Sequence, residues 1–512
     1  MENLQNIQAT TIVALILFAL IMVGIGLYSY RRTKTIDGFL LGGRNIGAWV
    51  SAFAYGTSYF SAVIFIGYAG KHGWDIGIGS IWIGVGNAVL GCLLAWLLAA
   101  KRTRRMTHKM KSKTMPEFFE ARYLSKPMKI FAAIIIFIFL VPYSAAVYKG
   151  LGSMFNTIFP AIPVNYCMLI IAVLTATYLV LGGYLATAYT DFVQGIIMIV
   201  GVFAMIVAVV NCDKVGGFGE WHAKLAAITD NGDGITGSQL TNIFGGNSWK
   251  FLCTNILLTS FGTWGLPQMV TKYYAIKDEK SVKQATVIST LFCMIIGCGA
   301  YFIGSLSRIV LGNTLPAGKY DAVIPQMLVS SLGGSSLTVI ILAVILILLL
   351  SASMSTLASV VLTSSSAISV DLLPEISKKF TDKHQLKASR ILCLLFVALS
   401  YIFATMNISI IVNIMSFSWG VVSGCFIGAY IWGIYQKGTT KAGAWAGMIG
   451  GLLTVLIPTV ILTINGGFSA AVSKTPEMGV AAMAVSVITV PIVSLFTKKL
   501  NQEHLTEIFK QD

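Results

Sequence analysis

Charged residues are scarce in this chain. They make up 11% of its 512 residues while apolar residues make up 56%, against typical values near ~25% and ~45–50% in soluble proteins. The sequence also lacks a recognisable Ser-His-Asp set, a His-rich metal site, a phosphate-binding loop, a dinucleotide fingerprint and cysteines at metal-binding spacing. These absences exclude a soluble globular protein and argue against an enzyme.

Long apolar segments recur along the whole chain. About 20 apolar residues suffice to cross the ~30 Å hydrocarbon core of a bilayer, so the pattern predicts an all-α polytopic membrane protein with about thirteen transmembrane helices. The first segment has no basic residues before it and Arg31 and Arg32 after it, unlike a cleavable signal peptide. The expected spans are 9–29, 46–70, 76–100, 128–156, 165–185, 190–211, 251–270, 286–312, 336–368, 391–406, 409–435, 442–465 and 477–496.

The net charge of +16 is concentrated in alternate loops. Because short loops rich in Lys and Arg stay in the cytoplasm, this alternation predicts an N-terminus outside and a C-terminus inside. Contact with anionic headgroups of the lipid bilayer accounts for the basic excess without any nucleic acid. The basic segments are 31–44, 101–129, 272–283, 378–390, 437–441 and 498–510.

A dense run of hydroxyl side chains follows a long apolar run. Residues 339–350 are all apolar, and residues 351–366 contain nine Ser or Thr, with no charge or proline in either run. We therefore expect one helix, in which Ser351, Ser355 and Ser359 recur every fourth residue and share a face. Two interpretations remain open. The hydroxyls line a pathway or coordinate an ion, or they let neighbouring helices pack closely.

Two predicted spans are interrupted by small and polar residues at mid-membrane depth. The first interruption lies between Gly56 and Ser61, and the second, in 260–267, ends at Pro267. Unwinding at such positions frees backbone carbonyls to face a cavity. The two spans are five apart and so run in opposite directions, as expected for the first helices of an inverted repeat. The alternative is a pair of Gly-rich packing helices.

The first interruption and the hydroxyl run together suggest a sodium site. Na⁺ is a hard cation that prefers oxygen ligands. Carbonyls of Thr57 and Phe60 with hydroxyls of Ser355 and Thr356 would supply them without a buried carboxylate. Asp191, at the predicted start of the sixth span, is the one exception. It is either a functional intramembrane acid or a carboxylate favoured by a helix N-terminus.

Five segments, in this order and spacing, carry a resemblance to a known family. They are Gly42–Arg44 with the interrupted span to Gly67, Gly182 through Gln194, Pro267 through Asp278, Ser353 through Leu357 with Ser365 and Asp371, and Trp419 to Trp432 with Gly443 and Ala444. From about residue 35 to 465 the chain resembles the sodium:solute symporter family, which includes bacterial proline, pantothenate, sialic acid and galactose transporters.

This resemblance implies a LeuT-like fold of five-plus-five inverted repeats. It also implies Na⁺-powered alternating access, a location in the bacterial cytoplasmic membrane, and no obligatory protein partner. The expected parts of the single transport domain 1–512 are a leading helix 9–29, repeats 46–211 and 251–435, two trailing helices in 442–496, and a cytoplasmic tail 497–512.

The resemblance also implies roles for individual residues. Asp191 matches a family acid near the route by which sodium leaves toward the cytoplasm. Members that bind a second sodium place a serine where this chain has Ala358, although Ser359 is retained, and this departure favours one Na⁺ per cycle. The main sodium site falls on backbone oxygens of Thr57, Phe60 and Ala352 and on hydroxyls of Ser355 and Thr356.

The substrate is specified only weakly. Tyr143 resembles a tyrosine that shapes binding in proline members, yet Val63 and Thr259 replace the tryptophans of those members and Ile64 replaces a glutamine of sugar binders. Lys149 either attracts an anionic solute or reaches the outer headgroups. The expected cavity residues are Val63, Ile64, Tyr143, Thr263, Trp264 and Phe417.

Together these expectations describe a sodium-coupled secondary active symporter that imports a small polar organic solute. An amino acid or carboxylate is favoured over a sugar. The alternatives are a sodium-coupled sugar or sialic acid symporter and a proton-coupled carrier of the same fold. Asp191 is the one good titratable candidate for the latter.

Overall fold

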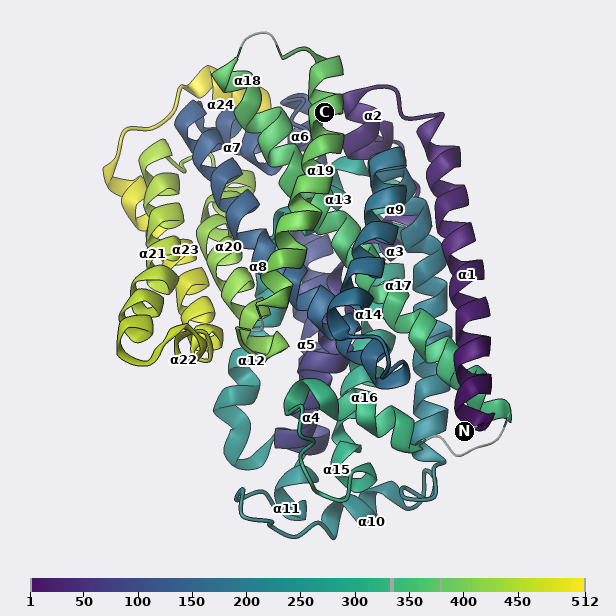
Figure 1. Ribbon diagram of the computed structural model, residues 1–512. Coiled ribbons are helices and arrows are strands. Elements are labelled where there is room, and N and C mark those ends of the chain that lie inside the picture. The colour runs from purple at the N-terminus through teal and green to yellow at the C-terminus, as the bar shows by residue number, and fades with distance from the viewer. Residues whose placement is uncertain (1, 332–335, 378–379, 407, 511–512) are drawn as a thin grey trace.

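Helices of very different length build the molecule (Figure 1). The computed structural model describes residues 2–331, 336–377, 380–406 and 408–510. Within these ranges, ten helical stretches are long and apolar enough to cross a membrane. The β pairing found in the same residues is a single isolated bridge between Ile46 and Ile276.

The elements follow one another with short connections. Up to residue 210 they are α1 (Glu2–Tyr30), α2 (Ile36–Leu41), η1 (Gly42–Arg44), α3 (Ala48–Tyr59), η2 (Val63–Tyr68), α4 (Ala69–Ile76), η3 (Gly77–Ser80), α5 (Ile81–Gly86), η4 (Asn87–Leu93), η5 (Trp96–Ala100), α6 (Lys101–Lys109), α7 (Met115–Tyr123), α8 (Lys126–Ile158) and α9 (Val164–Val210). After it they are α10 (Trp221–Ala226), α11 (Gly237–Leu240), η6 (Gly246–Ser248), α12 (Trp249–Gly265), α13 (Pro267–Ala275), α14 (Glu279–Ser305), α15 (Ser307–Val310), α16 (Tyr320–Ser331), α17 (Ser336–Ser366), η7 (Ala367–Leu372), α18 (Leu373–Ile376), α19 (Asp382–Thr405), α20 (Ile411–Tyr435), α21 (Lys441–Gly466), α22 (Phe468–Val472), α23 (Thr475–Phe496) and α24 (Gln502–Phe509).

Two of the apolar helical stretches are too long for one crossing. Val63–Lys109 and Val164–Val210 have 47 residues each, about 70 Å at 1.5 Å per residue. Glycines in the left-handed region divide them, Gly77 with φ 72° and Gly183 with φ 56°. A Cβ on Gly183 would also lie 2.5 Å from Phe39, so both the conformation and the space require glycine there. Both divisions fall close to predicted span boundaries, and the total of thirteen crossings stays a prediction.

Short elements gather at two opposite ends of the molecule (Figure 1). We call the end with α2, α6, α7, α18 and α24 the C-terminal end, and the end with α10, α11, α15 and α16 the far end. Four of the predicted basic segments lie among the elements of the C-terminal end. The loop assignment was wrong for three basic residues, because Lys272 lies buried in α13, Arg122 in α7 and Lys129 in α8. Lys378 and Lys379 lie outside the described residues.

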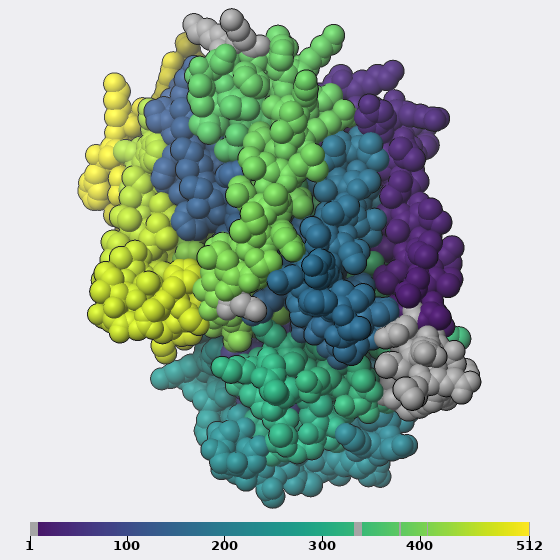
Figure 2. All heavy atoms as spheres, viewed as in Figure 1, coloured from purple at the N-terminus to yellow at the C-terminus, as the bar shows by residue number. Residues whose placement is uncertain are grey.

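Helices α17 and α20 occupy the centre of the molecule. In their apolar windows 78% and 94% of residues are buried, against 22% for α1 and 33% for α21 and α23. Helix α1 packs on α9 and α17, whereas α21 and α23 pack on α20. Figure 2 shows these leading and trailing segments, in purple and yellow, on opposite flanks. This arrangement agrees with a central bundle flanked by one leading and two trailing helices.

The first predicted interruption is present, four residues later than its first glycine. Helix α3 is continuous through Gly56 and ends at Tyr59, and Phe60 is extended with φ −104° and ψ 106°. A separate helical segment, the π-helix η2, begins at Val63. The backbone between α3 and η2 is therefore free of the regular helical pattern at a buried position.

The second interruption is present as well. Helix α12 ends at Gly265, Leu266 is extended with φ −79° and ψ 121°, and α13 starts at Pro267. Pro267 explains this break, because a residue that precedes proline is driven to extended backbone. The end of α13 meets the start of α3 at the Ile46–Ile276 bridge. The two broken helices consequently run in opposite directions, as the sequence predicts.

Candidate functional site

Helix α17 meets the end of α3 in a group of oxygens that we call the hydroxyl cluster, formed by Thr57, Ala352, Ser355 and Thr356. The Ser355 Oγ lies 2.9 Å from the Thr57 carbonyl oxygen and the Thr356 Oγ1 lies 3.2 Å from it. Both hydroxyls lie 3.1 Å from the Ala352 carbonyl oxygen. All four residues are buried. Two hydroxyls and two carbonyls thus converge at one point inside the bundle.

This donor set fits a hard monovalent cation. It consists of neutral oxygens and contains no thiolate or imidazole, the ligands that favour transition metals. The structure therefore brings together four of the five residues predicted for Na⁺. The fifth, Phe60, lies three residues after Thr57, where its N–H makes the last α3 bond, to the Gly56 carbonyl, and its extended backbone leads out of the helix.

The hydroxyl stripe of α17 continues from the cluster toward the C-terminal end. Ser359 lies one turn after Ser355 and is buried. One turn further, Thr363 lines a cavity of about 20 Å³ together with Ser359 and Lys113, the latter from the segment between α6 and α7. Such a cavity holds about one water molecule. The placement favours the pathway interpretation of the stripe over simple packing.

A buried ion pair lies beside this stripe. The Lys272 Nζ donates to the Ser359 Oγ at 2.9 Å and lies 3.7 Å from the Asp191 Oδ2. The two charged side chains are 2% and 0% exposed. Asp191 lies eight residues beyond the kink at Gly183, inside α9, so its neighbour is an ammonium group and not a helix N-terminus.

Lys272 was not predicted as a site residue, because it lies after the Pro267 break at the start of a basic stretch. A signal was available. Tyr273, Tyr274 and Ala275 follow it directly, and such neighbours are unusual for a solvated loop.

Next to the hydroxyl cluster lies an aromatic cluster of Tyr59, Phe60, Tyr143 and Trp419. The Trp419 ring centroid lies 6.1 Å from that of Tyr59 and 5.9 Å from that of Tyr143, and the Tyr59 and Phe60 rings stack at 4.6 Å. The Tyr143 hydroxyl and the Trp419 Nε1 are buried and face each other, and neither has a hydrogen bond of normal geometry among the described residues. Two donors inside a protein without partners are costly, so they indicate a place where a polar ligand binds.

Three other predicted substrate residues lie around this cluster. Val63 and Ile64 are buried directly after the helix break. Thr263 follows Gly262, whose added Cβ would lie 2.8 Å from the Trp419 ring. The Thr263 hydroxyl, however, lies within hydrogen-bond distance of the Gly91 and Ser260 carbonyls. Thr263 is thus near the aromatic cluster with its hydroxyl already engaged.

The other two predicted substrate residues, Trp264 and Phe417, do not join the aromatic cluster. The Trp264 Nε1 donates to the Leu90 carbonyl, and its ring packs on a separate apolar group with Leu258 and Met483. Phe417 packs on Phe139 and Phe468 and lines a groove between α8, α19 and α20. In the described part of the chain, neither side chain has a ring pair or hydrogen bond with the aromatic cluster.

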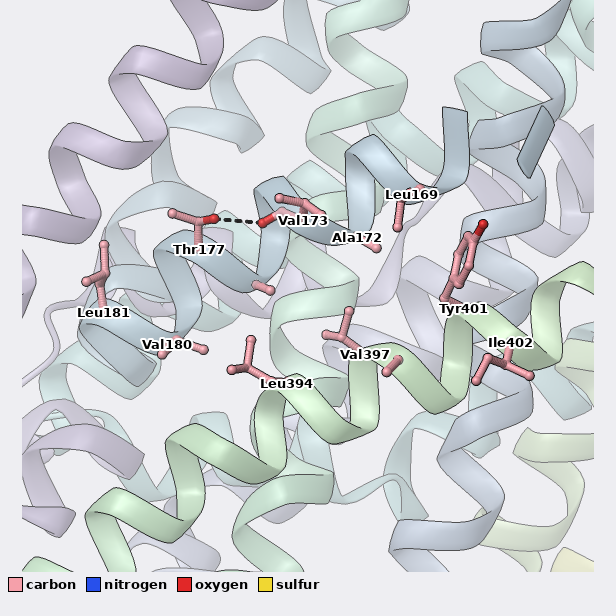
Figure 3. Close-up of a pocket in the computed structure, with 12 residues that line it drawn as sticks. Leu169, Ala172, Val173, Thr177, Val180, Leu181, Leu394, Val397, Tyr401 and Ile402 are labelled. Atoms are coloured by element: carbon pink, nitrogen blue, oxygen red, sulfur yellow. Dashed lines mark hydrogen bonds between the residues drawn. The ribbon is translucent and has the colours of Figure 1, made fainter. Parts of the chain in front are cut away.

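A larger cavity, of about 520 Å³, lies between α9 and α19 (Figure 3). Its lining is apolar except for Thr177 and Tyr401, and the Thr177 hydroxyl already donates to the Val173 carbonyl. Small polar solutes need several polar contacts to fix their orientation. This cavity therefore does not compete with the hydroxyl and aromatic clusters as the candidate site.

Lys149 forms an ion pair at the far end, and the two roles considered from the sequence stay predictions. Its Nζ lies 3.1 Å from the Asp321 Oδ2 and donates to the Ser409 carbonyl at 2.6 Å. The Asp321 Oδ1 also accepts from the Ile411 N–H at 3.2 Å. This pair ties α8 to α16 and to the start of α20 at the far end.

The family model for the sodium:solute symporter family matches residues 39–451. The chain belongs to this family. A symporter with these relatives is a transporter that uses Na⁺ and carries a small solute, and the matched range contains the hydroxyl cluster, the aromatic cluster and both ion pairs.

Named relatives of this symporter cover nearly its whole length. It is 28% identical to the high-affinity proline transporter PutP of Bacillus subtilis (strain 168) over 485 residues, which cover 94% of this chain and 97% of that one. It is 27% identical to a sodium/proline symporter of Staphylococcus aureus (strain JH9), covering 88% of this chain and 87% of the relative.

Solved structures bear out the predicted LeuT-like fold. A Na⁺-coupled sialic acid symporter in a substrate-bound outward-open state superposes with a TM-score of 0.76 at 18% identity, covering 96% of this chain and 99% of that one. The nucleobase-cation-symport-1 family transporter Mhp1 superposes with a TM-score of 0.52 at 12% identity, covering 92% and 97%. The symporter is accordingly an all-helical, multi-pass membrane protein with this fold.

Proposed function

We propose that the protein imports a small amino acid or a related carboxylate together with one Na⁺, by alternating access, and that it has no enzymatic activity. The observation that carries this proposal is the convergence of the Ser355 and Thr356 hydroxyls on the Thr57 carbonyl at a helix break. Broken helices in corresponding positions of two repeats are the usual place of a transporter's binding site.

The sodium ion would bind in the hydroxyl cluster. There the two hydroxyls would turn from their carbonyl partners and present their oxygens, with the carbonyls of Thr57 and Ala352, and that of Phe60 from the break. Because these ligands join α3 to α17, a bound cation would stabilise the arrangement in which the two helices meet. Coupling requires only that this arrangement also build the solute site.

One Na⁺ supplies enough energy for accumulation. A charge that falls through ~100 mV releases about 2.3 kcal/mol, and a tenfold concentration ratio adds about 1.4 kcal/mol. Their total of about 3.7 kcal/mol supports roughly a 500-fold gradient of a neutral or zwitterionic solute.

The solute would lie against the aromatic cluster. The Tyr143 hydroxyl and the Trp419 Nε1 are two buried donors that need an acceptor, and a carboxylate offers two oxygens. Val63 and Ile64 would form an apolar wall. The proline transporters among the relatives support an amino acid as the solute, while the roles of Thr263, Trp264 and Phe417 stay predictions.

The C-terminal end of the molecule would face the cytoplasm of a bacterial cell. Basic segments gather there, and positively charged loops favour the cytoplasmic side. Sodium released from the hydroxyl cluster would then pass Ser359, Asp191 and the small cavity beside Thr363. Residues 1–512 would act as one transport domain in the cytoplasmic membrane, without an obligatory protein partner.

Uptake into proteoliposomes tests this function. Radiolabelled proline, other amino acids, short carboxylates, sialic acid and galactose would be offered under a Na⁺, K⁺ or proton gradient in turn. We expect accumulation of an amino acid or carboxylate under the Na⁺ gradient. Accumulation driven by external acid and indifferent to Na⁺ would reject the sodium coupling, and selective accumulation of a sugar would reject the solute class.

A further inference from the structure

The Lys272 ammonium group lies in a pocket that is shaped for a cation. An ammonium group has three donors. One donates to the Ser359 Oγ at 2.9 Å, the Asp191 carboxylate lies 3.7 Å away, and the Tyr184 ring lies 5.1 Å from the Nζ, within cation–π range. The residue is 1% exposed. Lysine thus places a buried amine beside the hydroxyl stripe, toward the C-terminal end of the molecule.

A short chain of hydrogen bonds connects this charge to the hydroxyl cluster. The Ser359 Oγ, which accepts from Lys272, lies 2.8 Å from the Ser58 Oγ. Ser58 follows Thr57 directly, and the Thr356 Oγ1 lies 3.4 Å from the Ser58 carbonyl oxygen. The ammonium group is therefore two side chains away from the oxygens proposed to bind Na⁺.

The pair is held more loosely than a structural ion pair of this depth would be. A separation of 3.7 Å is too long for a hydrogen bond, and neither oxygen of Asp191 has a hydrogen-bond partner among the described residues. The buried Gln268 amide and Tyr184 hydroxyl also lack hydrogen-bond partners among the described residues. Both residues line the small cavity together with Lys272. Stability alone does not explain such a group of unsatisfied oxygens and a lysine.

We infer that the Lys272 ammonium group fills a second cation position, formed by the Asp191 carboxylate and the Ser58 and Ser359 hydroxyls, and so takes the place of a second Na⁺. This inference rests on the proposed sodium coupling. The tethered cation neutralises Asp191 in every state of the cycle, so that only one mobile Na⁺ is needed. Removal of the amine, with the carboxylate kept, opens the position to a free Na⁺.

The test is equilibrium binding of radioactive sodium to purified full-length protein, at constant ionic strength and constant pH. We expect one Na⁺ per chain for the wild type and two for Lys272→Gln. In Asp191→Asn the unpaired ammonium repels the remaining Na⁺, and we expect the Kd for Na⁺ to rise by about tenfold, within the usual range of coupling between neighbouring sites.

Two variants serve as controls. Lys272→Gln with Asp191→Asn has no charge at the position, so we expect one Na⁺ per chain at nearly wild-type affinity, and this variant also provides a readout if a single variant does not fold. Lys149→Gln makes the same substitution in the other ion pair and should bind one Na⁺.

The outcomes separate the inference from the proposed function. A wild type that binds no Na⁺ rejects sodium coupling itself. A folded Lys272→Gln that binds one Na⁺, a wild type that binds two, or an Asp191→Asn with unchanged sodium affinity overturns the tethered cation and leaves sodium coupling intact.

Discussion

The two lysine–aspartate pairs of the symporter have the same chemistry and opposite surroundings. At the far end, Lys149 and Asp321 are 3.1 Å apart and 18% and 10% exposed. Each also has a backbone partner, the Ser409 carbonyl for the amine and the Ile411 N–H for the carboxylate. Toward the C-terminal end, Lys272 and Asp191 are 3.7 Å apart, almost fully buried, and without backbone partners in the described residues.

This difference supports separate roles, a pair that holds helices together and a pair that we propose serves the transported ion. The far-end pair is satisfied and bridges α8, α16 and the start of α20, as expected of a contact that closes one face. The buried pair is undersatisfied and lies two side chains from the hydroxyl cluster. Buried polar networks that are only partly satisfied are costly, and proteins retain them chiefly at functional positions.

The largest expected effect is on stability. Asp191→Asn leaves a buried ammonium without its counter-charge, and we expect the free energy of unfolding to fall by about 3–5 kcal/mol. Asp321→Asn leaves Lys149 bonded to the Ser409 carbonyl and 18% exposed, so we expect a loss of about 1–2 kcal/mol. Reversible SDS denaturation in mixed micelles measures both.

A double variant shows whether the loss of stability in Asp191→Asn comes from the unpaired ammonium group. Adding Lys272→Gln to Asp191→Asn removes the stranded charge and should recover most of the lost stability. Equal losses for Asp191→Asn and Asp321→Asn would show that the contrast between the two pairs has no energetic meaning.

The hydroxyl cluster could be predicted largely from the sequence because most of its signals are local, and Ala352 was predicted only from the family resemblance. Four-residue periodicity places Ser355 and Ser359 on one face of any helix, and Pro267 breaks any helix that contains it. The segment that faces these hydroxyls could also be predicted, because the run from Gly56 to Ser61 interrupts an otherwise apolar span.

The rest depends on contacts between distant segments. Lys272 and Asp191 are 81 positions apart, and nothing in either neighbourhood fixes the distance between them. Trp419 enters the aromatic cluster because Gly262 on another helix leaves room for its ring. Trp264 and Phe417 lie on the expected helices but face other neighbours, since a rotation of one residue, about 100°, moves a side chain to a different face.

The next effect concerns the hydroxyl cluster, which is bonded to the buried pair and not to the far-end pair. Ser355→Ala and Thr356→Ala each remove one of the five oxygen ligands proposed for Na⁺. We expect the Na⁺ concentration for half-maximal uptake to rise by about tenfold, a change of about 1.4 kcal/mol, with the amount of protein in the membrane unchanged.

Thr363→Ala provides the matched control for these variants. Thr363 lies on the same stripe two turns from Ser355 but outside the cluster, and its removal should change the sodium dependence by less than about twofold. A shift as large as that for Thr356→Ala would mean that the stripe acts as a whole and that no single cluster binds the ion.

The smallest expected effect is at the far end, and it tests whether the satisfied pair acts as a closure. Lys149→Gln and Asp321→Asn should each change the rate of solute uptake by about three- to fivefold, the effect of a contact worth roughly 1 kcal/mol in one state of the cycle. The sodium dependence should stay as in the wild type, because no bond of the pair reaches the hydroxyl cluster.

If the two residues act together as one closing contact, the uptake rate of the double variant should equal that of either single variant. Independent roles would instead give the product of the two effects on the rate. Additive effects together with an altered sodium affinity would place Lys149 in the ion path and abolish the distinction between the two pairs.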